Sequence, residues 1–203
     1  EAAGAKRLIA LAARDELPDL VHKTVADTIF SNPDRTVRVL AATYFHAPTT
    51  ERGVAAAGVD SLRGSPDRGK LLFQSNCSSC HRLGNVGYRV GPDLTDIEQK
   101  LGRQALIESI AAPAREIAFG YEPVIILTDS GGAIGGFLLG RGETVVVKDG
   151  YGQRHTFARD RVESITPIAA SLMPGPRELR LSRQDVADLV QFLRTAEAEA
   201  SPE

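Results

Sequence analysis

The sequence predicts a mainly α-helical protein that also contains a small antiparallel β segment. Apolar residues recur at helical spacing in residues 1–46, 65–112 and 182–195. Short β-branched runs separated by Asp-Gly and Gly-Gly turns fill residues 121–167, which predicts a meander of four or five strands. With 203 residues, 42% hydrophobic and 25% charged, the chain is long enough to bury a sizeable core.

Residues 1–46 predict three short helices. Leu8, Ile9 and Leu11 begin an apolar pattern that continues through Leu17, Leu20, Val21, Val25 and Ile29, and Asn32-Pro33 suits the N-cap and first position of the third helix. Short helices joined by tight turns resemble HEAT-type repeats. A plain helical extension packed on the following domain accounts for the pattern equally well. Residues 47–64, which are small, polar and rich in glycine, are predicted to form a linker.

The run Cys77-Ser78-Ser79-Cys80-His81 is typical of a c-type haem attachment site. Two thiols at this spacing can bond to the two vinyl groups of a porphyrin, and the histidine that follows lies below the iron as a ligand. A zinc site needs further ligands, a thioredoxin-like pair follows a strand, and a structural disulfide gives no reason for the histidine. We therefore predict one covalently bound haem c, held by Cys77, Cys80 and His81.

The single methionine, Met173, is the best candidate for the second axial ligand of the iron. It lies in the Pro/Gly-rich segment Ser171-Leu172-Met173-Pro174-Gly175-Pro176, just before the last predicted helix. A lone methionine is usually a core residue, but a thioether in such a loop can reach the iron. The alternative is a bis-histidine site that uses His155 or His46, although the position of His155 favours a surface hairpin.

Cys-x-x-Cys-His, then Gly91-Pro92-Asp93-Leu94, then a methionine loop before a final helix resembles a class I cytochrome c domain. We place this domain at residues 65–203. The resemblance implies that the carbonyl of Pro92 bonds the second ring nitrogen of His81 and tunes it as a ligand. It also implies that the first and last helices of the domain cross, with Gly69 and Phe73 near Leu189 and Phe192 or Leu193.

The same resemblance suggests surroundings for the haem edge. Tyr88 and Arg89 would lie near this edge and meet the propionates. Gly84, Gly87 and Gly91 suit a loop wrapped closely around a flat ligand.

The β insert at residues 121–167 departs from an ordinary class I cytochrome. A small SH3-like barrel or a curled sheet fits its length. A haem domain with such an insert, preceded by HEAT-like helices, resembles the haem-binding domain of large planctomycete and verrucomicrobial proteins. In those proteins the domain is often fused to a dehydrogenase, which implies a fused dehydrogenase or a separate redox protein as partner.

Charge and hydropathy exclude some other functions. The net charge of −2, with no basic run, argues against nucleic acid. No apolar stretch approaches the ~20 residues that span a bilayer. The chain opens on Glu1-Ala2-Ala3-Gly4, so we expect a processed or truncated N-terminus, and the haem prediction implies the periplasm.

These observations predict a periplasmic monohaem cytochrome that transfers single electrons and is not an enzyme. The first alternative is a haem enzyme or sensor, peroxidase-like or gas-binding, in which Met173 is displaced easily. The second alternative is a docking module in which haem is structural.

Overall fold

The chain divides into two compact units, each built from two separate stretches of sequence. The computed structural model describes residues 2–30, 32, 37–38, 41, 44–45, 56, 58–168 and 170–196. Glu1–Thr50 and Phe119–Leu172 form one unit, which we call the sheet unit, and Glu51–Ala118 and Met173–Glu203 form the other, which we call the helical unit. The structure thus groups the β insert with the N-terminal residues. The boundaries at residues 1–46, 47–64 and 65–203 stay a prediction.

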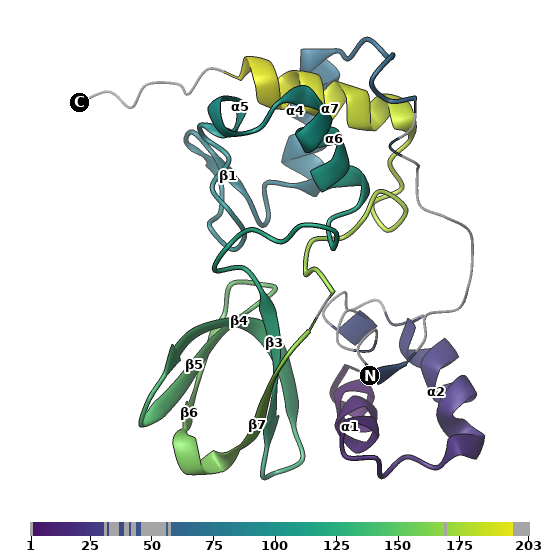
Figure 1. Cartoon of the computed structure of the whole chain (residues 1–203), viewed down its shortest axis with the longest axis vertical. Helices are drawn as coiled ribbons and strands as arrows, with labels where there is room; N and C mark the ends of the chain where they lie inside the picture. Colours follow the sequence, from purple (N-terminus) through teal and green to yellow (C-terminus); the bar gives the residue numbers. More distant parts are fainter. Residues whose placement is uncertain are drawn as a thin grey trace. The chain divides into compact units, whose positions relative to one another are not determined.

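The sheet unit contains a five-stranded antiparallel sheet in the order β6-β5-β4-β3-β7 (Figure 1). Its elements are β3 (Pro123–Thr128), β4 (Ala133–Arg141), β5 (Thr144–Asp149), β6 (Arg154–Ala158), the 3₁₀ turn η1 (Arg159–Arg161) and β7 (Val162–Pro167). Tight turns join β3 to β6 in sequence, so each of these strands pairs with the next, whereas β7 returns to pair with β3. This arrangement confirms the predicted meander.

Only the three-residue turn η1 separates the two edge strands β6 and β7 in the chain, so the sheet is curled and brings its edges together. An apolar cluster of the sheet consists of Val124, Ile126, Val145, Val147 and Val162. Phe157 of β6 and Ile165 of β7 both pack against it. The interior strand β3, which pairs with β4 and β7, is buried along its whole length, and this accounts for its uninterrupted apolar run. The curl agrees with the predicted small barrel or curled sheet.

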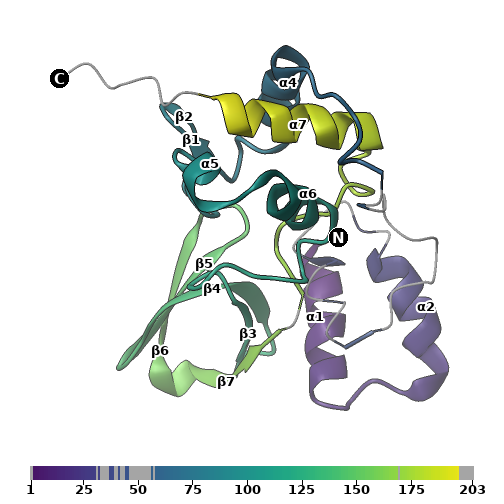
Figure 2. The same ribbon diagram turned by 45° about the horizontal axis from the view of Figure 1, so that its top comes forward.

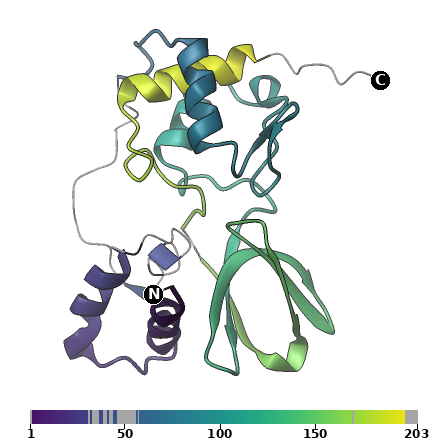
Figure 3. The same cartoon turned by 180° about the vertical axis from the view of Figure 1, so that it is seen from behind.

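The first helix of the sheet unit packs on the sheet. This helix, α1 (Ala2–Ala13), contacts β4 and buries Ile9 and Ala10 completely (purple in Figure 3). Just after it, Arg14 donates a hydrogen bond of 3.1 Å to the Thr128 carbonyl and pairs with the Glu163 carboxylate. Backbone and side-chain contacts therefore join the end of α1 to β3 and β7.

The second helix, α2 (Asp19–Phe30), leaves part of its apolar face in solvent. Ile29 is buried, but Leu20 is 92% exposed and Val21 is also exposed, although the apolar spacing groups them with Ile29. The predicted third helix lies largely outside the described residues, as does most of the predicted linker. Of its predicted start, Asn32 is described and Pro33 is not. The HEAT-type resemblance stays a prediction.

Four helices are described in the helical unit, at the positions that the sequence predicts. They are α4 (Pro66–Asn76), α5 (Ile97–Lys100), α6 (Arg103–Ala111) and α7 (Arg183–Thr195), with a short hairpin of β1 (Arg82–Leu83) and β2 (Val86–Gly87) between α4 and α5. Helices α4 and α6 both pack against α7 (Figure 2). Their apolar faces share one core, which includes Phe73, Ile107, Val186, Leu189 and Val190.

Glycines on the α4 side let the backbones of α4 and α7 touch where the two helices cross (Figure 3). A Cβ on Gly69 would lie 2.1 Å from the Asp188 carbonyl oxygen and 2.6 Å from the Cβ of Phe192. One turn further along α4, the Phe73 and Phe192 rings pack at 5.7 Å between centroids, tilted by 50°. The predicted contact of Gly69 and Phe73 with the last helix is confirmed, with Asp188 and Phe192 as the partners.

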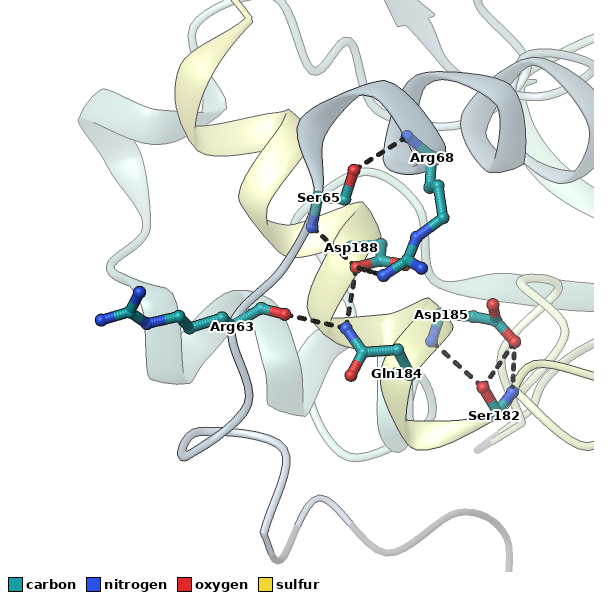
Figure 4. Close-up of polar contacts among 7 residues, drawn as sticks. All are labelled: Arg63, Ser65, Arg68, Ser182, Gln184, Asp185 and Asp188. Atoms are coloured by element: carbon teal, nitrogen blue, oxygen red, sulfur yellow. Dashed lines mark hydrogen bonds and ion pairs between the residues drawn. The ribbon is translucent and has the colours of Figure 1, made fainter.

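A buried carboxylate connects the N-terminus of α4 to α7 (Figure 4). Asp188 is 1% exposed and accepts hydrogen bonds from the Ser65 N–H (2.7 Å) and the Gln184 amide (2.9 Å), and it pairs with the Arg68 guanidinium at 2.8 Å. Burial alone would raise the pKa of this carboxyl. The hydrogen bonds from Ser65, Arg68 and Gln184 outweigh burial and hold the pKa below its usual value.

Both crossing helices begin with N-caps whose residue types favour a helix start. Ser65 is the N-cap of α4, and its hydroxyl accepts from the Arg68 N–H with Pro66 at the first helical position. Ser182 and Asp185 form a reciprocal capping box at the start of α7 (Figure 4). These caps satisfy backbone N–H groups that have no partner within a helix.

Candidate functional site

The Cys-x-x-Cys-His run begins where α4 ends and continues in a tight turn. Cys77 is the C-cap of α4, and its N–H donates to the Phe73 carbonyl at 2.8 Å. The N–H groups of Cys80 and His81 both donate to the Cys77 carbonyl, at 3.0 and 2.8 Å. The helix therefore fixes the first cysteine, and the turn fixes the second cysteine and the histidine relative to it.

The loop after His81 folds back onto this turn. Tyr88 donates its N–H to the Ser78 carbonyl at 3.0 Å, and Gly91 donates to the Cys80 carbonyl at 2.8 Å. A Cβ on Gly91 would lie 2.8 Å from Cε1 of the His81 ring, so the backbone of Gly91 passes directly against the imidazole. Glycine at this position allows the loop to enclose the ring.

The imidazole of His81 is oriented by the carbonyl of Pro92. Nδ1 lies 2.8 Å from the Pro92 oxygen, which is the hydrogen bond that the family resemblance implies. Because a carbonyl only accepts, Nδ1 carries the proton, and the lone pair of the neutral ring is on Nε2. Nε2 is then the nitrogen that can ligate a metal, with the Pro92 bond fixing the tautomer and the ring plane.

The two cysteines lie in a setting that differs from that of a thioredoxin-type redox pair. No disulfide joins Cys77 and Cys80. The pair follows a helix and not a strand, unlike a thioredoxin-type site. Within the part of the chain that the structure describes, no group of three or more His, Cys, Asp or Glu side chains is placed to hold a metal ion.

Burial also controls the chemistry of the first thiol. Burial, and secondarily the neighbouring Cys80, raise the pKa of Cys77 to about 11. Before haem is attached, the Cys77 side chain is therefore a protonated thiol at neutral pH. It lies against the apolar core of the helical unit.

A set of apolar side chains borders this core but stays only partly buried. The set includes Cys77, Leu83, Leu94, Ile97, Leu101, Met173 and Leu179. A flat apolar group bound against them would remove this surface from water, at about 25 cal/mol per Å² of apolar area. With two thiols and an oriented imidazole on the same unit, the residues present fit a covalently bound haem.

Leu83 and Ile97 belong to this set although no sequence pattern predicted it. Both lie close to predicted site residues: Leu83 two positions after His81, and Ile97 three positions after Leu94. The one sequence feature that could have identified them is that each is an isolated apolar residue among polar and glycine residues. Such a residue contacts the core only when the loop around it folds back. Helical or strand periodicity does not predict how a loop folds.

The loop of Met173 is fixed at the side that leads into α7. The Leu181 N–H donates to the Pro176 carbonyl at 2.7 Å, and the Gly175 N–H donates to the Glu178 carboxylate at 3.0 Å. Leu181 is buried in the core of the helical unit, directly before the capping box. Met173 packs against this core, in the same compact unit as His81.

The two other histidines considered as ligands are placed differently. His155 bonds the carboxylate of Asp149 at 2.8 Å within the hairpin of β5 and β6. Such a contact is expected of a surface hairpin residue, which the sequence favours for His155 over an iron ligand. His46 lies outside the described residues.

The loop residues assigned to the haem edge form a polar network of their own. Arg89 pairs with Asp93 at 3.2 Å. A hydrogen bond from the Thr95 hydroxyl is the main cause that lowers the pKa of Asp93, and Arg89 adds to it. Tyr88 is 70% exposed. The approach of Tyr88 and Arg89 to haem propionates stays a prediction.

Comparison with known proteins agrees with this geometry. The family model for cytochrome c matches residues 66–124, from the start of α4 into β3. A cytochrome c-553-like protein of Synechocystis sp. is 35% identical over 52 residues, which are 26% of this chain and 49% of the relative. The chain thus spans about half the length of the curated relative that it matches. It contains a cytochrome c domain, and its cofactor is haem c, bound covalently and containing iron.

Proposed function

We propose that this protein is a monohaem electron carrier in which His81 and Met173 are the two axial ligands of the iron. The observation that supports this most directly is the 2.8 Å bond between Nδ1 of His81 and the Pro92 carbonyl, directly after two cysteines at haem-attachment spacing. That bond is the one expected of a ligating histidine. Met173 is the only methionine, and it packs on the same core as Cys77.

In this proposal each of the four residues at the attachment turn has a separate role. Cys77 and Cys80 supply thiols for the covalent bonds, His81 supplies the imidazole, and Pro92 fixes the ring. When bound, the haem supplies one-electron chemistry, as its iron cycles between ferrous and ferric. Met/His ligation raises the reduction potential. With His81 and Met173 both holding the iron, the group would exchange an electron with little rearrangement of these residues, and the chain would need to supply no acid, base or nucleophile.

The partner and the location belong to the same proposal. We infer a redox partner, either a separate protein or a fused dehydrogenase, and a periplasmic location, where c-type haem is attached in bacteria. The net charge of −2 gives no support to nucleic acid as a partner. Throughout the described ranges, every helix is too short or too polar to cross a membrane.

Visible absorption of the holoprotein, oxidised and reduced, with and without carbon monoxide, tests the ligand set. We expect a low-spin spectrum with the weak sulfur-to-iron band of the oxidised state and no response to the gas. Met173→Ala should retain covalent haem, lower the potential, lose this band and bind carbon monoxide. Leu179→Ala is the matched control, because Leu179 packs on the same core from the same loop without a sulfur atom.

Two results would contradict the proposal. An unchanged spectrum and potential in Met173→Ala would remove Met173 from the ligand set. A wild-type protein that is high-spin and binds carbon monoxide would favour the haem enzyme or sensor over the electron carrier.

A further inference from the structure

A polar network in the loop directly after Pro92 is centred on the hydroxyl of Thr95. Asp93 accepts hydrogen bonds at Oδ1 from the Thr95 hydroxyl and from the Thr95 N–H, the latter at 3.0 Å. The same hydroxyl oxygen accepts the Gly84 N–H at 3.0 Å. The Thr95 side chain therefore donates one bond and accepts another. It joins the segment that leads from Pro92 into α5 to the turn between β1 and β2 (Figure 2).

The two segments joined by Thr95 are also bonded on either side of His81. Arg82 directly follows His81, and its carbonyl accepts the Leu94 N–H at 2.8 Å. The Arg82 side chain donates from Nε to the Gly84 carbonyl at 2.6 Å. With the bond from Nδ1 of His81 to the Pro92 carbonyl, these contacts close a ring of hydrogen bonds that includes the histidine itself.

The direction of the Pro92 carbonyl depends on how Asp93 is held. The Pro92 carbonyl and the Asp93 N–H belong to one planar peptide group, and the proline ring fixes φ on the other side of Pro92. The remaining rotation, ψ of Pro92, moves the carbonyl and Asp93 together. Because Asp93 is bonded to Thr95 two residues further on, in the manner of an Asx turn, this rotation is restrained.

Two interactions restrain the Asp93 carboxylate, and the bonds from Thr95 are the stronger. Arg89 pairs with Asp93 at 3.2 Å, but the Arg89 side chain is 66% exposed and the Asp93 side chain 34%. An ion pair this exposed contributes little, whereas a hydrogen bond to a charged group is stronger than one between neutral groups. The Thr95 hydroxyl is accordingly the main cause that lowers the pKa of Asp93, ahead of Arg89.

We propose that Thr95 is a positioning residue for the iron ligand, and that its hydroxyl keeps the Pro92 carbonyl bonded to Nδ1 of His81. Asp93 transmits this restraint through the peptide group that it shares with Pro92. The proposal rests on the proposed function, because it needs His81 as a ligand of the haem iron. A firm bond at Nδ1 increases electron donation from Nε2, which favours ferric over ferrous iron. The Thr95 hydroxyl therefore lowers the reduction potential of the bound haem.

Thr95→Val tests this role, because it replaces the hydroxyl by a methyl group of similar size and changes no charged residue. In the holoprotein we expect the reduction potential to rise, by the equivalent of about threefold in the equilibrium constant for reduction, with the low-spin spectrum retained. Thr95→Ser keeps the hydroxyl and should have the wild-type potential. Thr195→Val is the matched control, because the Thr195 hydroxyl bonds the Gln191 carbonyl within α7 of the same unit, and it should leave the potential unchanged.

Hydrogen exchange, followed by NMR in the reduced and diamagnetic holoprotein, gives a readout apart from the potential. In Thr95→Val the Gly84 N–H loses its acceptor and should exchange faster. If Thr95 positions the Pro92 carbonyl, the Nδ1 proton of His81 should exchange faster as well. A purely structural role of Thr95 would accelerate exchange at Gly84 alone.

Two results would overturn the proposal: an unchanged potential in Thr95→Val, or faster exchange at Gly84 with an unchanged Nδ1 proton of His81. Should valine prevent folding, Thr95→Ala makes the same test, since it removes the hydroxyl without adding bulk. Loss of reversible one-electron reduction in the wild type would instead refute the proposed function. The two failures are therefore distinguishable.

Discussion

Gly69→Ala tests the helix crossing on which the haem-binding unit is built. The new Cβ would lie 2.1 Å from the Asp188 carbonyl oxygen and 2.6 Å from the Cβ of Phe192. Carbon atoms pack at about 3.5–4.0 Å, so α4 and α7 must separate by more than about 1 Å. Neither obstacle is the flexible end of a side chain, because one is backbone and the other is a Cβ.

The expected cost follows from three contributions. Overpacking of this kind costs about 1–3 kcal/mol, and we expect the upper end because backbone must move. Weakening of the Phe73–Phe192 contact, at 5.7 Å between centroids, adds about 0.5–1.5 kcal/mol. Replacing a helical glycine by alanine returns about 1 kcal/mol. The net loss is about 2–3 kcal/mol, which lowers the midpoint of a small unit by about 10 °C or more.

Thermal unfolding of the holoprotein, followed by haem absorbance, measures this loss. Gly4→Ala is the matched control, since Gly4 is also within a helix but a Cβ added there would meet no atom within 4 Å. It should leave the haem transition unchanged. A midpoint of Gly69→Ala within about 2 °C of wild type would mean that the two backbones do not approach so closely.

Three further substitutions separate the roles of other residues. Asp188→Asn should lower the free energy of unfolding by about 2 kcal/mol at neutral pH. Because the folded pKa of Asp188 is depressed, its stabilisation is present above the unfolded pKa of about 3.9 and is lost on acidification. The stabilities of wild type and variant, plotted against pH, should therefore converge below about pH 4, and parallel curves would contradict this. Gly91→Ala should displace the His81 ring, from which its Cβ would be 2.8 Å, and shift the haem reduction potential; an unchanged potential and spectrum would argue against ligation by His81. His155→Ala should leave the haem spectrum as it is, because His155 bonds Asp149 in its own hairpin, and a spectral change would revive the bis-histidine alternative.

The sequence was most informative where local chemistry decides the structure. Ser65-Pro66 and Ser182 with Asp185 are caps whose bonds lie within one turn, so their residue types alone predict the helix starts, and the structure confirms both. The alternation of β-branched runs with glycine turns predicts the meander for the same reason. The family resemblance added the Pro92 carbonyl bond, which periodicity does not reveal.

The sequence was least informative where burial depends on distant residues. Leu20 shares the helical spacing of Ile29, yet one is 92% exposed and the other is buried, since spacing defines a face but not what covers it. The partly buried residues Leu83 and Ile97 were missed because the loop that folds back over the attachment turn decides their contacts. The buried contacts of Asp188 could not be predicted either, because its partners Ser65 and Arg68 are more than a hundred residues away in the chain.

The pairing of β3 with β7 shows how a long β segment can separate His81 from Met173 in sequence without disturbing the helical unit. Val124 pairs with Pro167, and the Ile168 N–H donates to the Pro123 carbonyl at 3.0 Å, so the chain enters and leaves the sheet at neighbouring points. A segment with adjacent ends can be inserted into a connection without moving the elements on either side. Helices α4, α6 and α7 can therefore share one core although the sheet lies between α6 and α7 in the chain. Among the described residues, that core takes no side chain from residues 123–167, and we infer that the β segment is an insertion between α6 and α7.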